Sequence, residues 1–140
     1  MRKCSLLVIG LLIYIAVAGS AFAQSTDRDH PTPLTSNEVK GDLDGSAIEY
    51  FYSLNAGPGK VTITVDVKSS DGTTGINYEL LDSKAAKAII CCAFAQADST
   101  GESGRSIEST KLAKLQRVVL HLTPFKYGRG TYRIRISNEN

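Results

Sequence analysis

The sequence predicts an all-β fold, a single domain built as an antiparallel β-sandwich or barrel. Short segments in which apolar and polar residues alternate recur along the chain, and a period of two places successive side chains on opposite faces of a strand. Clusters of Gly, Pro, Asn, Asp and Ser separate these segments, and no convincing amphipathic helix lies between them. A chain of 140 residues allows one hydrophobic core, so a second domain is not expected.

Residues 1–23 are predicted to form a secretion signal. Arg2 and Lys3 give a positive start, Leu6 to Ala18 is an apolar run, and Ala21-Phe22-Ala23 fits a signal-peptidase site. The alternative is an uncleaved anchor, because the segment is just long enough to span a bilayer of about 30 Å. Cleavage is the favoured interpretation, and it predicts a protein exported to the periplasm or the extracellular space. The lack of Asn-x-Ser/Thr sites agrees with a bacterial source.

The mature chain is expected to have no net charge. Without Arg2 and Lys3, the 16 basic residues fall to 14, which equals the number of acidic residues. Composition therefore gives no reason to expect nucleic acid, or a membrane after signal cleavage, as a partner. Residues 24–37 are polar and contain two prolines, so a flexible lead-in is expected there. The β-sandwich domain is expected over residues 38–140.

The first well-marked strands lie in the amino-terminal half of this domain. In residues 47–54, the alternation predicts an inner face that consists of Ile48, Tyr50, Tyr52 and Leu54. Phe51 then lies on the opposite face, where it is the better candidate for an exposed aromatic ligand contact. After a Gly-Pro-Gly turn, residues 60–68 give the clearest strand, with four β-branched residues at every second position.

Four further strands are expected. Residues 76–81 and 115–122 repeat the alternation, and residues 131–137 form the last strand. Residues 87–94 are more ambiguous, because alanines allow a helix, but their β-favouring centre predicts a strand. Residues 97–106 are expected to form an exposed polar loop. In the last strand Arg133 and Arg135 point outward, and they are either a solvated face that protects an edge strand or a contact for an acidic ligand.

Cys91 and Cys92 are adjacent within an apolar segment. Two small hydrophobic residues on opposite faces of a strand are the favoured interpretation. A vicinal disulfide is the alternative; it would mark a turn, and an oxidising compartment would allow it. Metal binding by the pair has little support, because only His30 and His121 are available as further ligands of the usual type for such a site.

The Asp42-x-Asp44 spacing suggests a calcium loop, but the pattern does not fit an EF-hand. Lys40 would take the place of the first ligand and Phe51 that of the bidentate glutamate. A looser calcium site formed by Glu38, Asp42 and Asp44 remains open, and a simple turn before the first core strand is the alternative. No cofactor other than calcium is suggested by the sequence.

Catalysis has weak support in the sequence. His30 lies in the polar lead-in and His121 is predicted to be a surface residue of a strand, so a Ser-His-Asp arrangement is not indicated. Glu49 and Asp66 could face each other across neighbouring strands as an acidic pair. A small hydrolase therefore remains the least favoured hypothesis, and no catalytic residue is assigned.

Two groups of motifs resemble bacterial pre-peptidase C-terminal domains. The first comprises Gly41-Asp42-Leu43, Glu49-Tyr50-Phe51-Tyr52, Ala56-Gly57 and the strand Val61–Val67, and the second is the closing Gly130–Ile136. The resemblance covers residues 38–137. It implies a jelly-roll-like sandwich that serves as an accessory module, and related domains bind collagen with calcium support. This chain has fewer carboxylates than the family in residues 76–82, and Glu49 stands where aspartate is usual.

The sequence therefore predicts an exported, non-catalytic binding module for a protein or polysaccharide. A structural protein of the cell envelope without a small ligand is the alternative.

Overall fold

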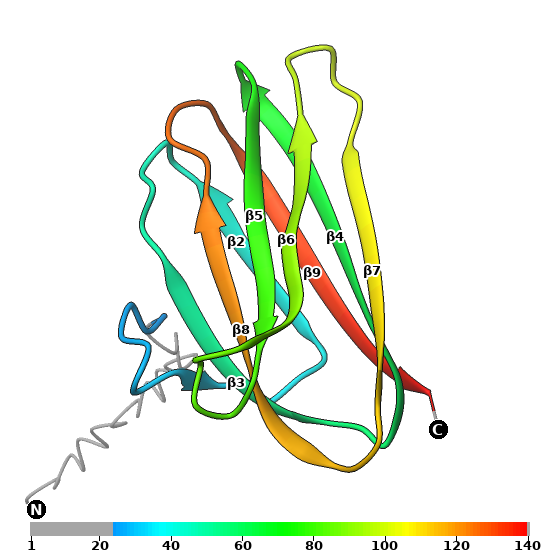
Figure 1. Ribbon diagram of the computed structural model, residues 1–140. Coiled ribbons are helices and arrows are strands. Elements are labelled where there is room, and N and C mark those ends of the chain that lie inside the picture. The colour runs from blue at the N-terminus through cyan, green and yellow to red at the C-terminus, as the bar shows by residue number, and fades with distance from the viewer. Residues whose placement is uncertain (1–23, 140) are drawn as a thin grey trace, which may run out of the picture.

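A computed structural model describes residues 24–139, which form nine strands and no helix (Figure 1). The strands are β1 (Thr32–Pro33), β2 (Glu38–Leu43), β3 (Tyr50–Ala56), β4 (Gly59–Asp71), β5 (Thr74–Leu81), β6 (Ala88–Ala97), β7 (Gly104–Leu112), β8 (Gln116–Pro124) and β9 (Arg129–Glu139). The all-β fold class is confirmed. Among the described residues no helix is long and apolar enough to cross a membrane. The predicted signal, residues 1–23, lies outside them.

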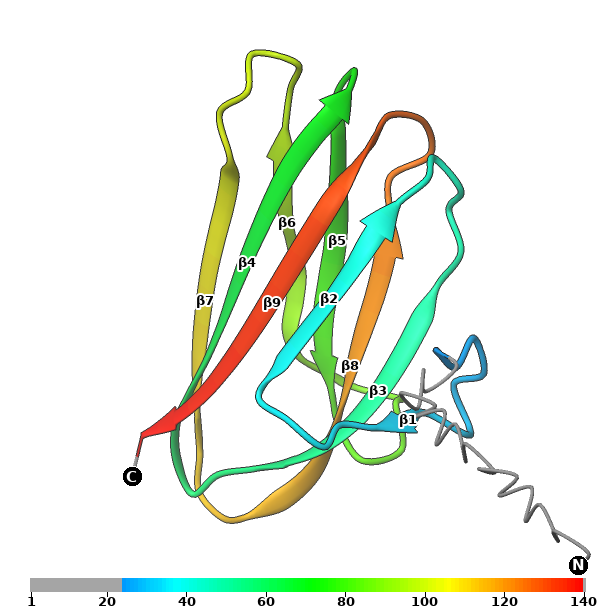
Figure 2. The same cartoon turned by 180° about the vertical axis from the view of Figure 1, so that it is seen from behind.

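The strands form two sheets that face each other (Figures 1 and 2). One sheet has the order β1-β3-β8-β5-β6 and the other β2-β9-β4-β7. The pairs β2–β9, β3–β8, β4–β7 and β5–β6 are nested and antiparallel, as if one long hairpin had been rolled up. This pairing is that of a jelly roll, in which most connections cross from one sheet to the other.

The core lies between the sheets and follows the predicted alternation. Val61, Ile63, Val65 and Val67 on β4 have no exposed surface, and they pack in one cluster with inward residues of β5, β8 and β9. The largest fully buried side chain is Tyr78, whose hydroxyl lies 2.7 Å from the hydroxyl of Ser106. This hydrogen bond satisfies the one polar atom that Tyr78 brings into the core.

Three details of the strand prediction were wrong. Residues 104–112 form strand β7, although residues 97–106 were expected to be a loop. Most β7 residues are exposed, because β7 is an edge strand, so its sequence lacks a buried alternation. Ile48 was expected on the inner face, but it is exposed and precedes β3. Arg133 and Arg135 do not protect an edge, because β9 lies inside its sheet.

Residues 24–37 make specific contacts with β3, which differs from the expected flexible lead-in. β1 pairs in parallel with β3, and the backbone N–H of Leu34 donates to the carbonyl of Ser53 at 2.8 Å. Further along the edge, the N–H of Phe51 donates to the carbonyl of Ser25 at 2.9 Å. These hydrogen bonds use backbone groups of β3 that would otherwise remain free at a sheet edge.

Candidate functional site

The outer face of the β2-β9-β4-β7 sheet contains a hollow of about 830 Å³ that is lined by charged side chains. Its charged residues, here named the charged trough, are Lys40, Asp42, Asp66, Lys68, Arg105, Arg133 and Arg135. The register explains why these residues meet. Asp66 on β4 is opposite Arg133 on β9 and opposite Arg105 on β7, so the outward positions of three strands form one cross-strand row.

Asp66 lies at the centre of the trough and accepts two charge-assisted hydrogen bonds. Nε of Arg105 is 2.5 Å from Oδ1, and Nη2 of Arg135 is 2.8 Å from Oδ2. The side chain of Asp66 is only 16% exposed. The hydrogen bond from Arg105, together with the one from Arg135, holds the pKa of Asp66 below its usual value. Asp66 therefore stays ionised and fixes both guanidinium groups in place.

Arg133 and Arg135 are exposed, as predicted, but they do not lie on a purely basic surface. Nε of Arg133 is 3.4 Å from Glu38, whose other oxygen lies 2.6 Å from Nζ of Lys40. These contacts lower the pKa of Glu38, and the hydrogen bond from Lys40 is the main cause. With Glu38 included, the trough combines five basic and three acidic side chains. The basic side chains thus exceed the acidic ones by two.

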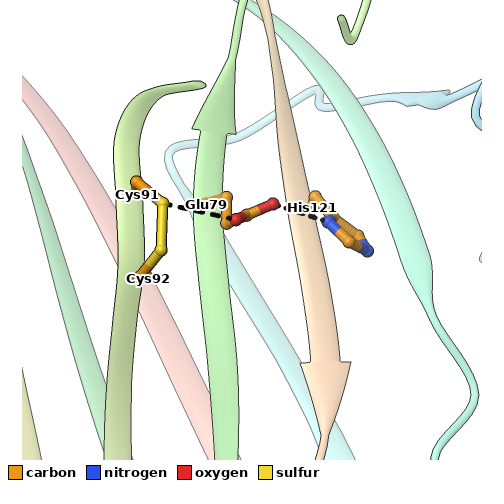
Figure 3. The surroundings of a disulfide bond; sticks show 4 residues. All are labelled: Glu79, Cys91, Cys92 and His121. Atoms are coloured by element: carbon orange, nitrogen blue, oxygen red, sulfur yellow. Dashed lines mark hydrogen bonds and ion pairs between the residues drawn. A yellow bond between two sulfur atoms is a disulfide. The ribbon is translucent and has the colours of Figure 1, made fainter. Parts of the chain in front are cut away.

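The opposite sheet holds a second group of polar side chains, a row that comprises Glu49, His121, Glu79, Cys91 and Cys92. Figure 3 shows the last four of these residues. Nδ1 of His121 is 3.1 Å from Oε2 of Glu79, and Nε2 is 3.2 Å from Oε2 of Glu49. A protonated imidazole can donate to both carboxylates, whereas a neutral one can donate to only one of them. Glu49, His121 and Glu79 are therefore joined by hydrogen bonds, and Glu79 lies next to the disulfide of Cys91 and Cys92.

His121 is a residue of the outer face of β8, as predicted, but its side chain is only 12% exposed. Its ring stacks on Phe51, with 4.5 Å between the ring centroids and an interplanar angle of 4°. The prediction of an exposed Phe51 was wrong, since Phe51 is 3% exposed. The face was predicted correctly, but Phe51 packs there with Leu81, Ala85 and Val119 in a second apolar cluster. Phe51 is thus part of the packing and is not a ligand surface.

Exposed aromatic rings occur elsewhere on the described part of the chain. Phe94 is 56% exposed on β6, and Tyr127 lies in the turn before β9 and is also exposed. Neither residue lies in a sequence pattern that indicates an exposed ligand contact. For Phe94, an outward position follows from its place opposite Asn77 in the register of β5 and β6.

The structure contains the vicinal disulfide, which the sequence left as the less favoured alternative. Sγ of Cys91 is bonded to Sγ of Cys92. Ile90 and Ala93 on either side are both buried, while both cysteines are exposed. The interpretation as two hydrophobic residues on opposite faces was therefore wrong, because a β-bulge at this point turns both side chains to the same face.

The three calcium candidates do not form one cluster. Glu38 is engaged by Lys40 and Arg133, and Asp44 accepts hydrogen bonds from the N–H and hydroxyl of Ser46. Among residues 24–139, the potential metal-ligand atoms that come within 4.8 Å of one another in a group of three or more belong to Glu79, Cys91 and Cys92. The looser calcium site of Glu38, Asp42 and Asp44 stays untested, and the contacts of Glu38 and Asp44 favour the alternative of a simple turn.

The acidic pair suggested for a hydrolase does not form. Glu49 lies beside β3 and contacts His121, whereas Asp66 lies on β4 of the other sheet. His30 is exposed and pairs with Asp27 at 2.7 Å. The residues that the sequence analysis missed are Arg105 and Glu79, and both could have been found only from the register between strands.

Comparisons with known proteins find a likeness only among solved structures. No family model matches the sequence, and no curated protein matches it either. Among solved structures, the chain is similar to the pre-peptidase C-terminal domain of a collagenase from Bacillus anthracis, with 19% sequence identity and a TM-score of 0.46. The likeness covers 78% of this chain and 96% of that one. The family that the sequence motifs resemble is also the family of this solved domain.

Proposed function

We propose that this chain is an exported, non-catalytic binding module whose charged trough holds an acidic segment of a protein or an acidic polysaccharide. The observation that supports this proposal most is the arrangement of Arg105, Arg133 and Arg135 in one hollow. Guanidinium groups bind carboxylates and other planar anions through paired N–H donors. Asp66 and Glu38 keep these groups oriented before any ligand arrives.

The dimensions and charge of the trough fit such a ligand. A volume of about 830 Å³ lies within the range of small-ligand sites and is open enough for a segment of a longer chain. The excess of basic over acidic side chains favours an anion. Because the trough is open to solvent, its attraction for a ligand is expected to weaken at high ionic strength.

Binding assays with simple polymers test this proposal. We expect the protein to bind polyglutamate or polygalacturonate, as a model acidic protein segment and a model acidic polysaccharide, more tightly than neutral dextran. The R133Q and R135Q substitutions should each weaken binding by about tenfold. Arg117→Gln is the matched control, since Arg117 is exposed on β8 of the other sheet.

Two results would contradict the proposal. The first is equal binding of anionic and neutral polymers, and the second is an equal effect of the Arg135 and Arg117 substitutions. Absence of binding to all three polymers would favour the structural alternative without a ligand. Which of the two anionic polymers binds more tightly distinguishes a protein from a polysaccharide partner.

Export is the second part of the proposal and is tested separately. The chain is expressed with its complete amino terminus, and the secreted or periplasmic fraction is analysed by intact mass. Cleavage after Ala23 predicts a mature chain that begins at Gln24. A chain retained in the membrane with residues 1–23 attached would contradict cleavage.

A further inference from the structure

The β-bulge in β6 places two cysteine side chains on one face of a strand. Tyr78 is paired with Ala93 and Leu80 with Ile90, so two residues of β6, Cys91 and Cys92, stand opposite the single residue Glu79. Cys92 has a φ of +63°, which turns the chain so that both cysteines are exposed. The ladder on either side of the bulge therefore holds both cysteines on the outer face of β6.

Glu79 is held in position to act together with the two sulfurs (Figure 3). One carboxylate oxygen, Oε2, lies 3.1 Å from Nδ1 of His121. The other, Oε1, lies 3.8 Å from Sγ of Cys91. His121 is itself fixed by Glu49 and by stacking on Phe51. Such a partner behind a ligand carboxylate is typical of metal sites, where it orients the ligand and raises its affinity.

The ligand atoms are already close enough for a metal ion. One oxygen of Glu79 and the two sulfurs lie within 4.8 Å of one another. In a tetrahedral zinc site the metal lies about 2.3 Å from sulfur and about 2.0–2.2 Å from oxygen. Once the S–S bond is broken, side-chain rotations that separate the two sulfurs and bring Glu79 closer would place all three atoms around one ion. The adjoining hollow of about 280 Å³, lined by Glu79, Cys92, His121 and Thr123 among others, leaves room for a water molecule as the fourth ligand.

We propose that Cys91, Cys92 and Glu79 form a redox-gated site for a soft divalent cation such as Zn²⁺, closed in the disulfide form and open in the dithiol form. A dithiol reductant gives two electrons and two protons to the Cys91–Cys92 bond and is itself oxidised to a disulfide. The S–S bond breaks, and each sulfur becomes a thiol. Zn²⁺ then displaces both thiol protons to solvent and binds two thiolates and the Glu79 carboxylate.

The donor set determines which cation is expected. Two thiolates select Zn²⁺ and similar soft ions over Ca²⁺ and Mg²⁺, which prefer sets of oxygen ligands. Both cysteines are exposed on β6, an edge strand, so a reductant and a metal can reach them. The site lies on the sheet opposite the charged trough, and it depends on neither the trough nor its ligand.

Metal titration of the oxidised and reduced protein tests this site. All samples contain the Cys4→Ser substitution, so that Cys91 and Cys92 are the only cysteines. The protein is reduced with a phosphine, intact mass verifies the gain of two hydrogens, and Co²⁺ and Zn²⁺ are added without oxygen. We expect thiolate-to-cobalt charge-transfer absorption and Zn²⁺ binding that is at least about 100-fold tighter in the reduced than in the oxidised protein.

Variants separate the contribution of each ligand. Cys91→Ser combined with Cys92→Ser should abolish the charge-transfer band. E79Q and H121Q should each weaken Zn²⁺ binding by about 10- to 100-fold. Glu108→Gln on β7 is the matched control, and it should leave the affinity for Zn²⁺ unchanged. The oxidised protein serves as a folded reference that has no free thiols.

Three outcomes would overturn the proposal. One is equal Zn²⁺ affinity of the oxidised and reduced forms. Another is unchanged binding by the double serine variant. The third is loss of the native circular dichroism spectrum upon reduction, because the proposal requires the fold to hold both thiols on one face. The first two outcomes would leave binding of anionic polymers at the trough unchanged, and for the third the polymer assay is made on the oxidised, folded protein.

Discussion

The phenol ring of Tyr132 lies directly over the α-carbon of Gly41. The two residues are register partners on β9 and β2. A β-carbon at position 41 would lie 2.5 Å from the hydroxyl oxygen of Tyr132 and 2.6 Å from its ring atoms Cε1 and Cζ. Gly41 belongs to the first motif group of the sequence and Tyr132 to the closing motif, so the two motifs meet in space. The glycine is needed because no larger residue leaves room for the ring.

Gly41→Ala is therefore expected to destabilise the protein by about 1–3 kcal/mol. Tyr132 is 3% exposed, so its ring cannot move into solvent at little cost. Denaturant unfolding measures the change in the free energy of unfolding. Combining the substitution with Tyr132→Leu, which removes the ring, should give a smaller loss than the sum of the two single changes. Additive losses would contradict the proposed contact.

Asp66→Asn should destabilise the protein by about 1 kcal/mol at neutral pH. Arg105 and Arg135 lower the pKa of Asp66 in the folded state below its ordinary value of 3.8. The ionised Asp66 therefore stabilises the folded protein fully at pH values above its ordinary pKa. This stabilisation is lost as the pH falls through the lowered pKa of the folded state. Thermal melts at neutral pH and well below pH 3.8 should therefore show the difference only at the higher pH.

Asp29→Asn provides the control for this experiment, since Asp29 is exposed in the segment before β1. We expect the melting temperature of the Asp29 variant to differ little from that of the unchanged protein at either pH. A pH-independent difference for the Asp66 variant would mean that the carboxylate charge does not stabilise the trough.

Phe51→Ala should reduce the free energy of unfolding by about 3 kcal/mol. Phe51 is buried with Leu81 and Val119 in the second apolar cluster, and its ring stacks on that of His121. Urea unfolding gives the loss, and Phe51→Leu, which keeps most of the apolar contact, should cost about half as much. A loss below about 0.5 kcal/mol, as is common for surface positions, would show that the cluster contributes little.

Calcium is expected to leave the thermal stability unchanged. Glu38 already pairs with Lys40 and Arg133, and Asp44 with Ser46, so binding would have to break these contacts. The measurement is a thermal melt in EDTA, followed by melts over a calcium titration. A ligand at a hundred times its Kd stabilises the folded state by about 2.7 kcal/mol. A saturable rise of several degrees would therefore contradict the expectation and make Asp42 and Asp44 targets for mutation.

The predictable part of the fold is that in which a strand has one buried face. Residues 61–67 alternate strictly, because β4 is covered by the other sheet on one side and by solvent on the other. β7 was not predicted because an edge strand buries few side chains. Of its residues only Leu112, at its end, is buried. An alternation of apolar and polar residues appears only where one face of a strand is buried, so the sequence of an exposed strand does not show it.

The candidate sites were less predictable, because they depend on contacts between strands. Arg133 and Arg135 could be placed on an outer face from their spacing alone. The pairing of Arg135 with Asp66 could not be predicted in this way, since the two residues lie 69 positions apart in the chain. Cys91 and Cys92 were assigned to opposite faces because a regular strand requires it, and the bulge that turns them arises from pairing with β5. Phe51 was placed correctly on the outer face, but the cluster that buries it was not visible in its own strand.

The nested pairing of strands has a consequence for protein synthesis. β2 obtains its neighbour only when β9 has been made, and β3 must wait for β8. Nearly the whole chain must leave the ribosome before either sheet can be completed, and contacts of such long sequence separation form slowly. A newly made chain therefore cannot complete the roll until its last strand has been made, and loss of β9 would leave β2, the first strand of the roll, without its partner.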